Sequence, residues 1–242
     1  MNPNDIRDQL KNEYPYRLEL HAHTYPVSRC SEVSPTELVD IYRSLGFNGL
    51  VVTNHFYSGT LDELPENQRV DAYLEAYHQA KDYAEGYGMK IYLGAELRFD
   101  ENANDYLLYG VDEPILRQAR EYFSKGLACY RREVSLSRSI LLQAHPFRPG
   151  MVLADPALLD GVEAYNMHCG HNNTTALAVR YGAAQHFAVT SGGSDFHNPG
   201  RGHEGALALR ARRLPEDSFG IAALLKSGDF VFELGGQAIL LP

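Results

Sequence analysis

Apolar residues along the chain follow two periods, one typical of strands and one typical of amphipathic helices. Short apolar runs predict strands near residues 17–20, 49–53, 90–96, 105–111, 140–144, 161–166, 187–190, 206–209 and 230–234. Apolar residues at helical spacing predict helices over residues 35–45, 70–87, 114–137, 174–185 and 215–227. Repeated strand-then-helix units without a linker-like stretch predict one α/β domain, residues 1–242, with parallel strands, for which a barrel is one arrangement.

Two helix starts carry residues that commonly cap helices. Ser34 precedes Pro35, which suits a first helical turn, and Asn173 precedes the apolar stripe of residues 174–185. A polar loop over residues 61–67 is expected to lie near the functional site.

Composition limits the classes of function. The formal net charge of −9 argues against a dedicated nucleic-acid binder, because an acidic surface repels phosphate backbones. The negative charge does not exclude a phosphorylated substrate, since bound divalent cations would make a pocket locally positive. Cys30, Cys129 and Cys169 are odd in number and widely spaced, which supports neither a disulfide framework nor a Cys-rich zinc site. No apolar segment resembles a signal peptide or a membrane span, so we expect a cytoplasmic protein; its oligomeric state is open.

Residues able to bind metals recur where predicted strands end. His21 and His23 follow the first strand at a spacing that places both side chains on the same side of it. Later strands end near further candidates, namely His55, Glu96, His145, Asp195 and His197. Because the carboxyl ends of parallel strands collect functional groups, this recurrence predicts a metal centre. Mixed imidazole and carboxylate ligands favour Zn, Mn or Fe.

These motifs, taken in order, resemble those of a known family. The chain contains His21-Ala-His23-Thr24, Thr53-Asn54-His55, Gly94-Ala-Glu96, Ala144-His145-Pro146, Glu163-Ala-Tyr-Asn166 and Gly193-Ser-Asp195-Phe-His197. In this order they look like the motifs of the PHP superfamily, named after polymerases and histidinol phosphatase. The match spans about residues 18–197, and residues 198–242 would complete the same domain. The resemblance implies a single-domain distorted (β/α)7 barrel that hydrolyses phosphate esters with two or three divalent metal ions.

The resemblance also implies which residues bind each metal ion. It makes His21, His23, Glu96 and Asp195 the ligands of one ion. Glu96 would bridge to a second ion, which also takes His145. A third ion would be held by His55 and His197.

The chain departs from the family pattern at three places. Many members have an Asp or His shortly after the His-x-His motif, and a His on the strand after the Gly-x-Glu motif. In this chain both positions lack those residues, and Glu32, Cys30 or Asp105 could bind a metal in their place. Asn54 replaces the usual Asp of the Thr-Asp-His motif, which weakens an expected contact that orients a ligand.

The expected chemistry is hydrolysis of a small phosphate monoester by a metal-bridging hydroxide. Arg148 follows His145 by three residues and could hold the phosphate and stabilise charge in the transition state. Asn166, His168 and Arg201 are further candidates for substrate binding, with a solvated loop as the alternative reading. The leaving alcohol could take its proton from a metal-bound water or from a histidine that is not a ligand.

Three functions stay open at this point. The first is a metal-dependent phosphatase for a small phosphorylated metabolite. The second, also allowed by the resemblance, is a phosphodiesterase or exonuclease acting on nucleotides or nucleic-acid ends, against which the acidic charge argues. The third is a catalytically inactive, metal-stabilised interaction module.

Overall fold

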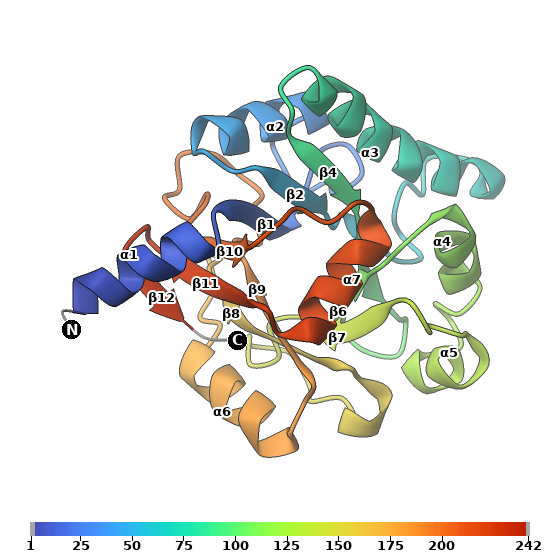
Figure 1. The fold of residues 1–242 in the computed structure, drawn as a ribbon. Helices are drawn as coiled ribbons and strands as arrows, with labels where there is room; N and C mark the ends of the chain where they lie inside the picture. Colours follow the sequence, from blue (N-terminus) through green and yellow to red (C-terminus); the bar gives the residue numbers. More distant parts are fainter. Residues whose placement is uncertain (1–2, 241–242) are drawn as a thin grey trace.

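Two six-stranded sheets form the framework of the protein (Figure 1), seen here in a computed structural model that describes residues 3–240. The first sheet runs in the order β12 (Ala238–Leu240), β11 (Phe230–Leu234), β10 (Leu207–Ala211), β1 (Tyr16–Ala22), β2 (Gly49–Val52), β4 (Lys90–Leu93). The second runs β3 (His55–Phe56), β5 (Ala95–Arg98), β6 (Asp105–Tyr109), β7 (Ile140–Gln143), β8 (Gly161–Asn166), β9 (Val189–Gly193). Residues 1–2 and 241–242 of the predicted domain lie outside the described residues.

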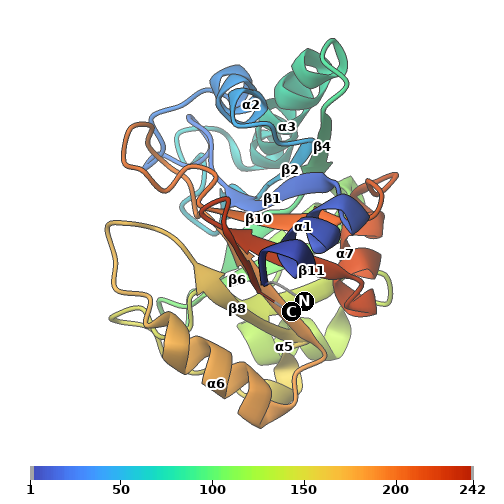
Figure 2. The same ribbon diagram turned by 60° about the vertical axis from the view of Figure 1, so that its left-hand side comes forward.

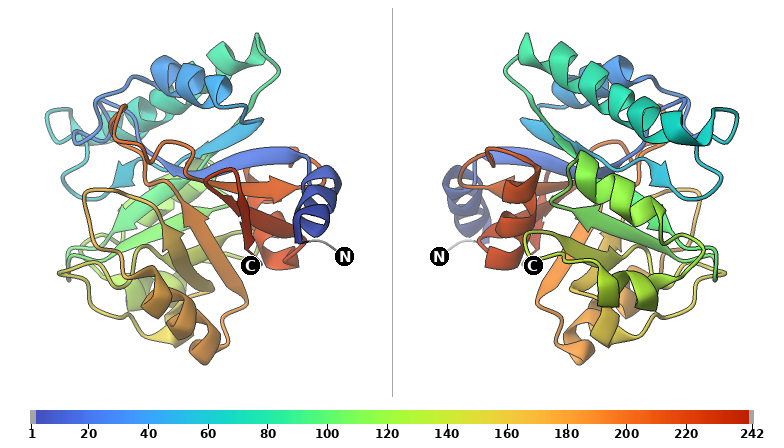
Figure 3. Two further views of the ribbon diagram at one scale, coloured as in Figure 1. Left: turned by 90° about the vertical axis from the view of Figure 1, so that its left-hand side faces the viewer. Right: turned by 90° about the vertical axis from the view of Figure 1, so that its right-hand side faces the viewer.

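Helices lie on the outer faces of both sheets (Figure 3), except that the last one lies across one end of the space between the sheets (Figure 1). They are α1 (Pro3–Glu13), α2 (Pro35–Ser44), α3 (Arg69–Glu85), α4 (Glu113–Arg120), α5 (Leu127–Glu133), α6 (Thr175–Gln185) and α7 (Ser218–Ser227). Helix α3 packs on α2 and β4, and α6 packs on β8. Short 3-10 turns span Glu66–Gln68 and Pro156–Leu158. Within residues 3–240, no helix is long and apolar enough to cross a membrane.

The sheets meet at two places. Strands β2 and β4 lead into β3 and β5, where the Gly94 N–H donates to the Val52 carbonyl at 3.0 Å. At the second place, Ala22 at the end of the inner strand β1 forms a parallel bridge with Phe196, which follows the edge strand β9. Side chains from both sheets and from α7 share one buried cluster, which includes Leu18, Leu107 and Ile221. The space between the sheets is therefore filled with apolar residues.

The expectation of parallel strands throughout is wrong. Strand β6 pairs antiparallel with both β5 and β7, and β10, β11 and β12 are antiparallel to their neighbours. The short loop 99–104 joins β5 directly to β6, and a connection that short can only make a hairpin, whereas parallel neighbours need a crossover. The described strands form two ladders, not the continuous ladder of a closed barrel.

The local prediction for α2 is confirmed, and that for α6 is wrong in one detail. The Ser34 hydroxyl accepts from the Glu37 N–H while the Glu37 carboxylate accepts from the Ser34 N–H, a full capping box. Helix α6 begins after Thr174, which makes no side-chain cap. The Asn173 side chain is used elsewhere, since its amide donates to Asn166. Helix α1 and strands β3 and β12 were not predicted, because they are polar or very short.

A buried carboxylate ties the N-terminal helix to the first sheet. Glu233 on β11 is only 4% exposed and lies 2.7 Å from the Lys11 ammonium, 3.1 Å from Arg17 and 2.8 Å from Arg210. Arg210 also donates to the Tyr14 carbonyl beyond the end of α1. Burial alone would raise the pKa of Glu233, but hydrogen bonds from Lys11 and Arg210 outweigh it and lower that pKa.

Replacement of Glu233 by glutamine is expected to cost about 3 kcal/mol of unfolding free energy at pH 7, because three cations would then lack their shared anion. Since the folded-state pKa lies below the unfolded value of about 4.3, the contribution is complete above that pH and is lost as pH falls through the folded pKa. The difference between wild type and Glu233→Gln should therefore shrink in acid. Urea unfolding at several pH values measures it.

The matched control is Glu13→Gln, which removes the carboxylate from an exposed pair with Arg212. Its effect should stay below about 1 kcal/mol. Equal losses in the two variants, or a Glu233→Gln loss that does not depend on pH, would contradict this account of Glu233.

Candidate metal centre

All seven residues predicted to bind metal come together at one end of the two sheets. His21 lies on β1, His55 on β3 and Glu96 on β5. His23, His145, Asp195 and His197 lie in the loops that follow β1, β7 and β9. Six of the seven are buried, and His55 is partly exposed. Loops after β1, β8 and β9 gather at this end, on the left of Figure 2.

Four of these residues have the geometry of a metal site. The Nε2 atoms of His21 and His23 lie 3.1 Å apart. Both lie 3.4 Å from oxygens of Glu96, and they are 3.4 and 3.3 Å from Asp195 Oδ1. A tetrahedral ion bound at about 2.1 Å has ligand atoms about 3.4 Å apart, so the distances from the two Nε2 atoms to each other and to each carboxylate fit a shared cation.

Hydrogen bonds fix which nitrogen of each imidazole faces this centre. His21 Nδ1 lies 2.7 Å from Glu163 Oε1, to which it donates. The Ser28 hydroxyl donates its only hydrogen to Asn54 Oδ1, so it accepts from His23 Nδ1 at 3.1 Å. Both Nε2 atoms are therefore left with lone pairs for a metal. Asn54 thus supplies the acceptor expected of the usual aspartate.

Two further groups of donor atoms adjoin the first. One consists of His55, Glu96 and Asp105, and the other of His23, His55 and His197, with the donor atoms of each within 4.8 Å of one another. His145 Nε2 lies 3.0 Å from Glu96 Oε1 and 3.8 Å from Asp105 Oδ2. The buried atoms Glu96 Oε2 and His145 Nδ1 have no hydrogen-bond partner among the described residues. The donor set fits more than one divalent ion.

Cys30 lies beside the third group. The imidazoles of His197 and His55 act on the pKa of its thiol. Burial would raise the pKa of this thiol, but the two imidazoles lower it to about 6. The neighbouring Arg29 pairs with Asp62 at 2.5 Å and with Glu63, which joins this loop to the predicted polar loop 61–67.

Arg148 lies at the centre but is already paired. Its Nη2 atom lies 2.6 Å from Asp195 Oδ2 and 3.1 Å from Asn166 Oδ1, and its Nε donates to Asn173. Both amide hydrogens of Asn166 are used, by Glu163 and by Asp195. Asn166 therefore holds its neighbours in place and has no amide hydrogen left for a ligand.

The remaining candidates line the rim near His197. The ring centroid of His168 lies 5.5 Å from that of His197 and 5.3 Å from that of His203. Burial lowers the pKa of His168 to about 4, so this imidazole is neutral near pH 7. His203 is 3% exposed, and neither ring nitrogen has a hydrogen-bond partner in residues 3–240. Arg201 is exposed in the same loop.

Close approach of β1 and β9 brings the two halves of the centre together. A Cβ atom on Gly193 would lie 2.5 Å from His21 Cβ and 2.9 Å from the His21 nitrogen, so only glycine fits. The buried Glu19 carboxylate accepts from the backbone of Leu20, His21 and Ser194. Glu19 and Gly193 were not predicted to matter, although Gly-Gly before Ser-Asp was a visible signal of close packing.

Charge and strain are concentrated at the same place. Asp195 and His145 adopt φ angles of 50° and 29°, in the left-handed region that non-glycine residues rarely use. Burial opposes ionisation of both Asp195 and His21, but attraction between them and their neighbours lowers the pKa of Asp195 and raises that of His21. Glu96 likewise helps to raise the pKa of His21.

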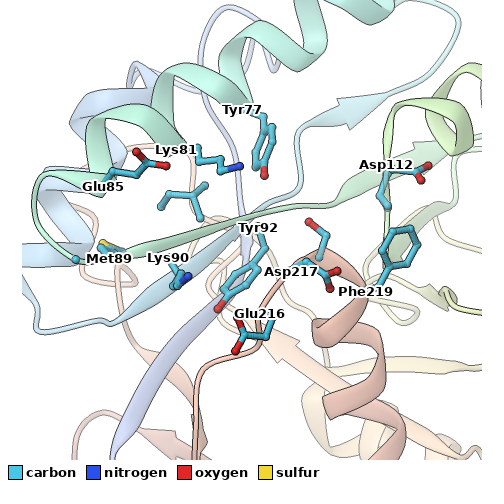
Figure 4. A pocket seen from close by; sticks show the side chains of 14 residues that line it. Tyr77, Lys81, Glu85, Met89, Lys90, Tyr92, Asp112, Glu216, Asp217 and Phe219 are labelled. Carbon is cyan, nitrogen blue, oxygen red and sulfur yellow. The ribbon is translucent and has the colours of Figure 1, made fainter.

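A separate surface cavity of about 610 Å³ lies away from this cluster. It opens at the start of β4, between α3 and the segment leading into α7, and Lys81, Lys90, Tyr92 and Asp217 line it (Figure 4). Glu96 lies beyond the opposite end of β4, and none of the seven predicted ligands lines this cavity. Its lysines are balanced by acidic side chains, so it offers no metal-binding chemistry comparable with the cluster.

Comparison with known proteins shows the class of fold. No protein-family model matches the chain, and no curated protein matches it. The structure is similar to a two-domain protein from Bacteroides vulgatus ATCC 8482, described as containing a predicted PHP-like metal-dependent phosphoesterase, with a TM-score of 0.62 and 15% identity. The likeness covers 90% of this chain and 64% of that protein, so the chain spans less than two thirds of its length.

Two other solved structures have lower scores. A candidate metal-dependent phosphoesterase from Bifidobacterium adolescentis ATCC 15703 has a TM-score of 0.49 at 17% identity, over 74% of this chain and 87% of that one. An amidohydrolase from Chromobacterium violaceum with bound sulfate has a TM-score of 0.47 at 16% identity, over 76% and 88%. The protein is a mixed α/β protein, and its fold is similar to that of the Bacteroides vulgatus protein.

Gly193→Ala is expected to lower the unfolding free energy by about 3 kcal/mol, because the new methyl group would collide with the His21 backbone. It should also weaken metal binding, since β1 and β9 would have to separate. Gly86→Ala is the matched control, because its Cβ would meet no foreign atom closer than 3.8 Å. Denaturant unfolding and metal analysis of both variants measure this, and equal stability of the two would refute the close-packing account.

Proposed function

We propose that the protein is a metal-dependent phosphoesterase that hydrolyses a small phosphate monoester. The observation that carries the proposal is that the Nε2 atoms of His21 and His23 lie 3.1 Å apart and 3.3–3.4 Å from oxygens of Glu96 and Asp195, while partners at their Nδ1 atoms leave both Nε2 lone pairs free. His145 with Asp105, and His55 with His197, would hold the further ions. When bound, divalent ions such as Zn, Mn or Fe neutralise the phosphate oxygens and lower the pKa of the attacking water.

Residues of the chain would orient the substrate. The guanidinium of Arg148 has five N–H donors, and its Nη1 atom makes no hydrogen bond among the described residues. We propose that Nη1 binds a phosphate oxygen while Nη2 keeps its contact with Asp195. His168 Nδ1 accepts from the Gly170 N–H, so its Nε2 carries a hydrogen that can reach the ester. The exposed Arg201 would attract the anion.

The strand order supports a finer description of the fold. Starting from β1, neighbouring strands run through β2 with β3, β4 with β5, and then β6, β7, β8 and β9, which returns to β1 through the Ala22–Phe196 bridge. We propose that these seven positions form a distorted (β/α)7 barrel, split where β2 and β4 give way to β3 and β5. We also propose that residues 1–242 form one domain.

The test is metal analysis of protein purified without chelator, combined with hydrolysis of a panel of phosphate esters. We expect two or three bound transition-metal ions and release of phosphate from monoesters. Asp195→Ala should reduce kcat/KM on the order of 100-fold or more, because a lost ligand costs at least as much as a lost outer partner. Asp82→Ala, which changes an exposed position on α3, is the matched control and should keep full activity.

Two results would overturn the proposal. A protein that releases no phosphate from any ester with Zn, Mn or Fe supplied is not a phosphoesterase, and the inactive interaction module becomes the better account. Hydrolysis of dinucleotides or single-stranded DNA ends in preference to monoesters would instead establish a phosphodiesterase.

A further inference from the structure

The Ser28 hydroxyl lies fully buried in the loop after β1, where three hydrogen bonds meet at its oxygen. Its Oγ atom lies 2.9 Å from Asn54 Oδ1, 2.9 Å from the His55 nitrogen and 3.1 Å from His23 Nδ1. A serine hydroxyl has one hydrogen to donate and two lone pairs that accept. These contacts use all three, so Ser28 can serve the centre only through these neighbours.

The main chain fixes the direction of each of these hydrogen bonds. The Thr24 N–H donates to Asn54 Oδ1 at 2.6 Å, and the Asn54 amide donates to the Thr24 hydroxyl at 2.8 Å, which sets the orientation of the amide. Because Asn54 Oδ1 can only accept and the His55 N–H can only donate, one lone pair of Ser28 is left for His23. His23 therefore donates from Nδ1 and keeps the Nε2 lone pair that faces the centre.

Ser28 joins different parts of the candidate metal centre. His23 and His55 each belong to two of the three groups of metal-binding donor atoms. The imidazole of His23 and the main chain of His55 both contact the same hydroxyl oxygen. The loop holds that oxygen in place, since the Ser28 N–H donates to the Thr24 carbonyl at 2.9 Å.

The two histidines of the first strand differ in the charge of the acceptor behind them. His21 Nδ1 donates to the Glu163 carboxylate at 2.7 Å. His23 Nδ1 donates to the neutral Ser28 hydroxyl, which itself donates to the neutral Asn54 amide. A charged acceptor makes an imidazole a stronger metal ligand than a neutral acceptor does. Changes in these two neutral side chains can therefore either weaken or strengthen His23 as a ligand.

We propose that Ser28 is a positioning residue that, oriented by Asn54, holds the His23 imidazole and the His55 main chain in the arrangement that binds metal ions. The inference rests on the proposed function, because it requires the metal centre, but it assigns a role to a residue that binds no metal itself. The hydroxyl also transmits to His23 the effect of the side chain at position 54.

The test is competition for Zn²⁺ between metal-stripped full-length protein and a chromophoric chelator. Ser28→Ala should weaken zinc binding at least about tenfold, because His23 loses the partner that orients it. Asn54→Asp should strengthen it, since a carboxylate makes the Ser28 hydroxyl a better acceptor for His23. In the double variant this gain should be lost, because the carboxylate acts through the hydroxyl. A gain of the same size in the double variant would contradict the proposal.

Ser31→Ala is the matched control. Ser31 is buried in the same loop, and its hydroxyl donates to the main-chain carbonyls of His23 and His197 without contacting an imidazole. This variant should keep the zinc affinity of the wild type. Equal losses in Ser28→Ala and Ser31→Ala would show that any hydroxyl of this loop has the same effect, and would overturn the specific role of Ser28.

Nitrogen NMR of the metal-free protein provides a second measurement that does not use metal binding. In the wild type the hydrogen of the His23 ring should be on Nδ1. Ser28→Ala should shift the ring toward the form with the hydrogen on Nε2, whereas Ser31→Ala should not. A wild-type His23 with its hydrogen on Nε2 would contradict the proposal.

The outcomes separate this proposal from the proposed function. A wild-type protein that binds no zinc would refute both. Zinc binding that Ser28→Ala leaves unchanged would refute the role of Ser28 and leave the phosphoesterase standing. Zinc binding that responds to the variants as expected, without phosphate release from any ester, would refute the phosphoesterase and support the role of Ser28.

Discussion

The candidate metal centre depends on one close contact between strands that are far apart in sequence. Gly193 lets β9 approach β1 so closely that a methyl group would collide with His21. The buried Glu19 carboxylate holds this contact by accepting the Ser194 N–H and hydroxyl together with the His21 N–H. Because His21 and Asp195 lie within two residues of this contact, their donor atoms meet only while it is kept.

Buried charge is the second constraint on this structure. Glu96, Glu163 and Asp195 lie among imidazoles in a region without solvent, where an unpaired carboxylate would cost several kcal/mol. Glu163 is satisfied by His21, Asn166 and the His145 N–H, whereas Oε2 of Glu96 has the His55 imidazole 2.7 Å away but no aligned hydrogen-bond donor. Glu163 thus orients an imidazole, whereas Glu96 and Asp195 face the centre. A metal site needs both kinds of carboxylate, one that orients a ligand and others that can bind the ion.

The sequence predicts this centre better than it predicts the framework. Strand-end residues such as His55 and His145 could be identified because apolar runs end just before them, and strand ends meet in space. The reversed direction of β6 was missed, although the short loop 99–104 between two predicted strands leaves room for a hairpin and not for a crossover. The role of Glu19 was hidden because it precedes His21 on a strand, where a buried carboxylate is unusual. Asn173 looked like a helix cap, but tertiary contacts with Arg148 take its side chain.

Arg148 connects the geometry of the metal ligands to the anion that the site would bind. Its Nη2 atom and the Asn166 amide both contact Asp195 Oδ2, which leaves Oδ1 facing His21 and His23. The same guanidinium keeps Nη1 free of protein partners among the described residues. A phosphate bound by Nη1 would therefore share one rigid, planar group with a metal ligand. In that arrangement a shift of the anion would be transmitted to Asp195, so one side chain would set the positions of both the substrate and the proposed metal ligand.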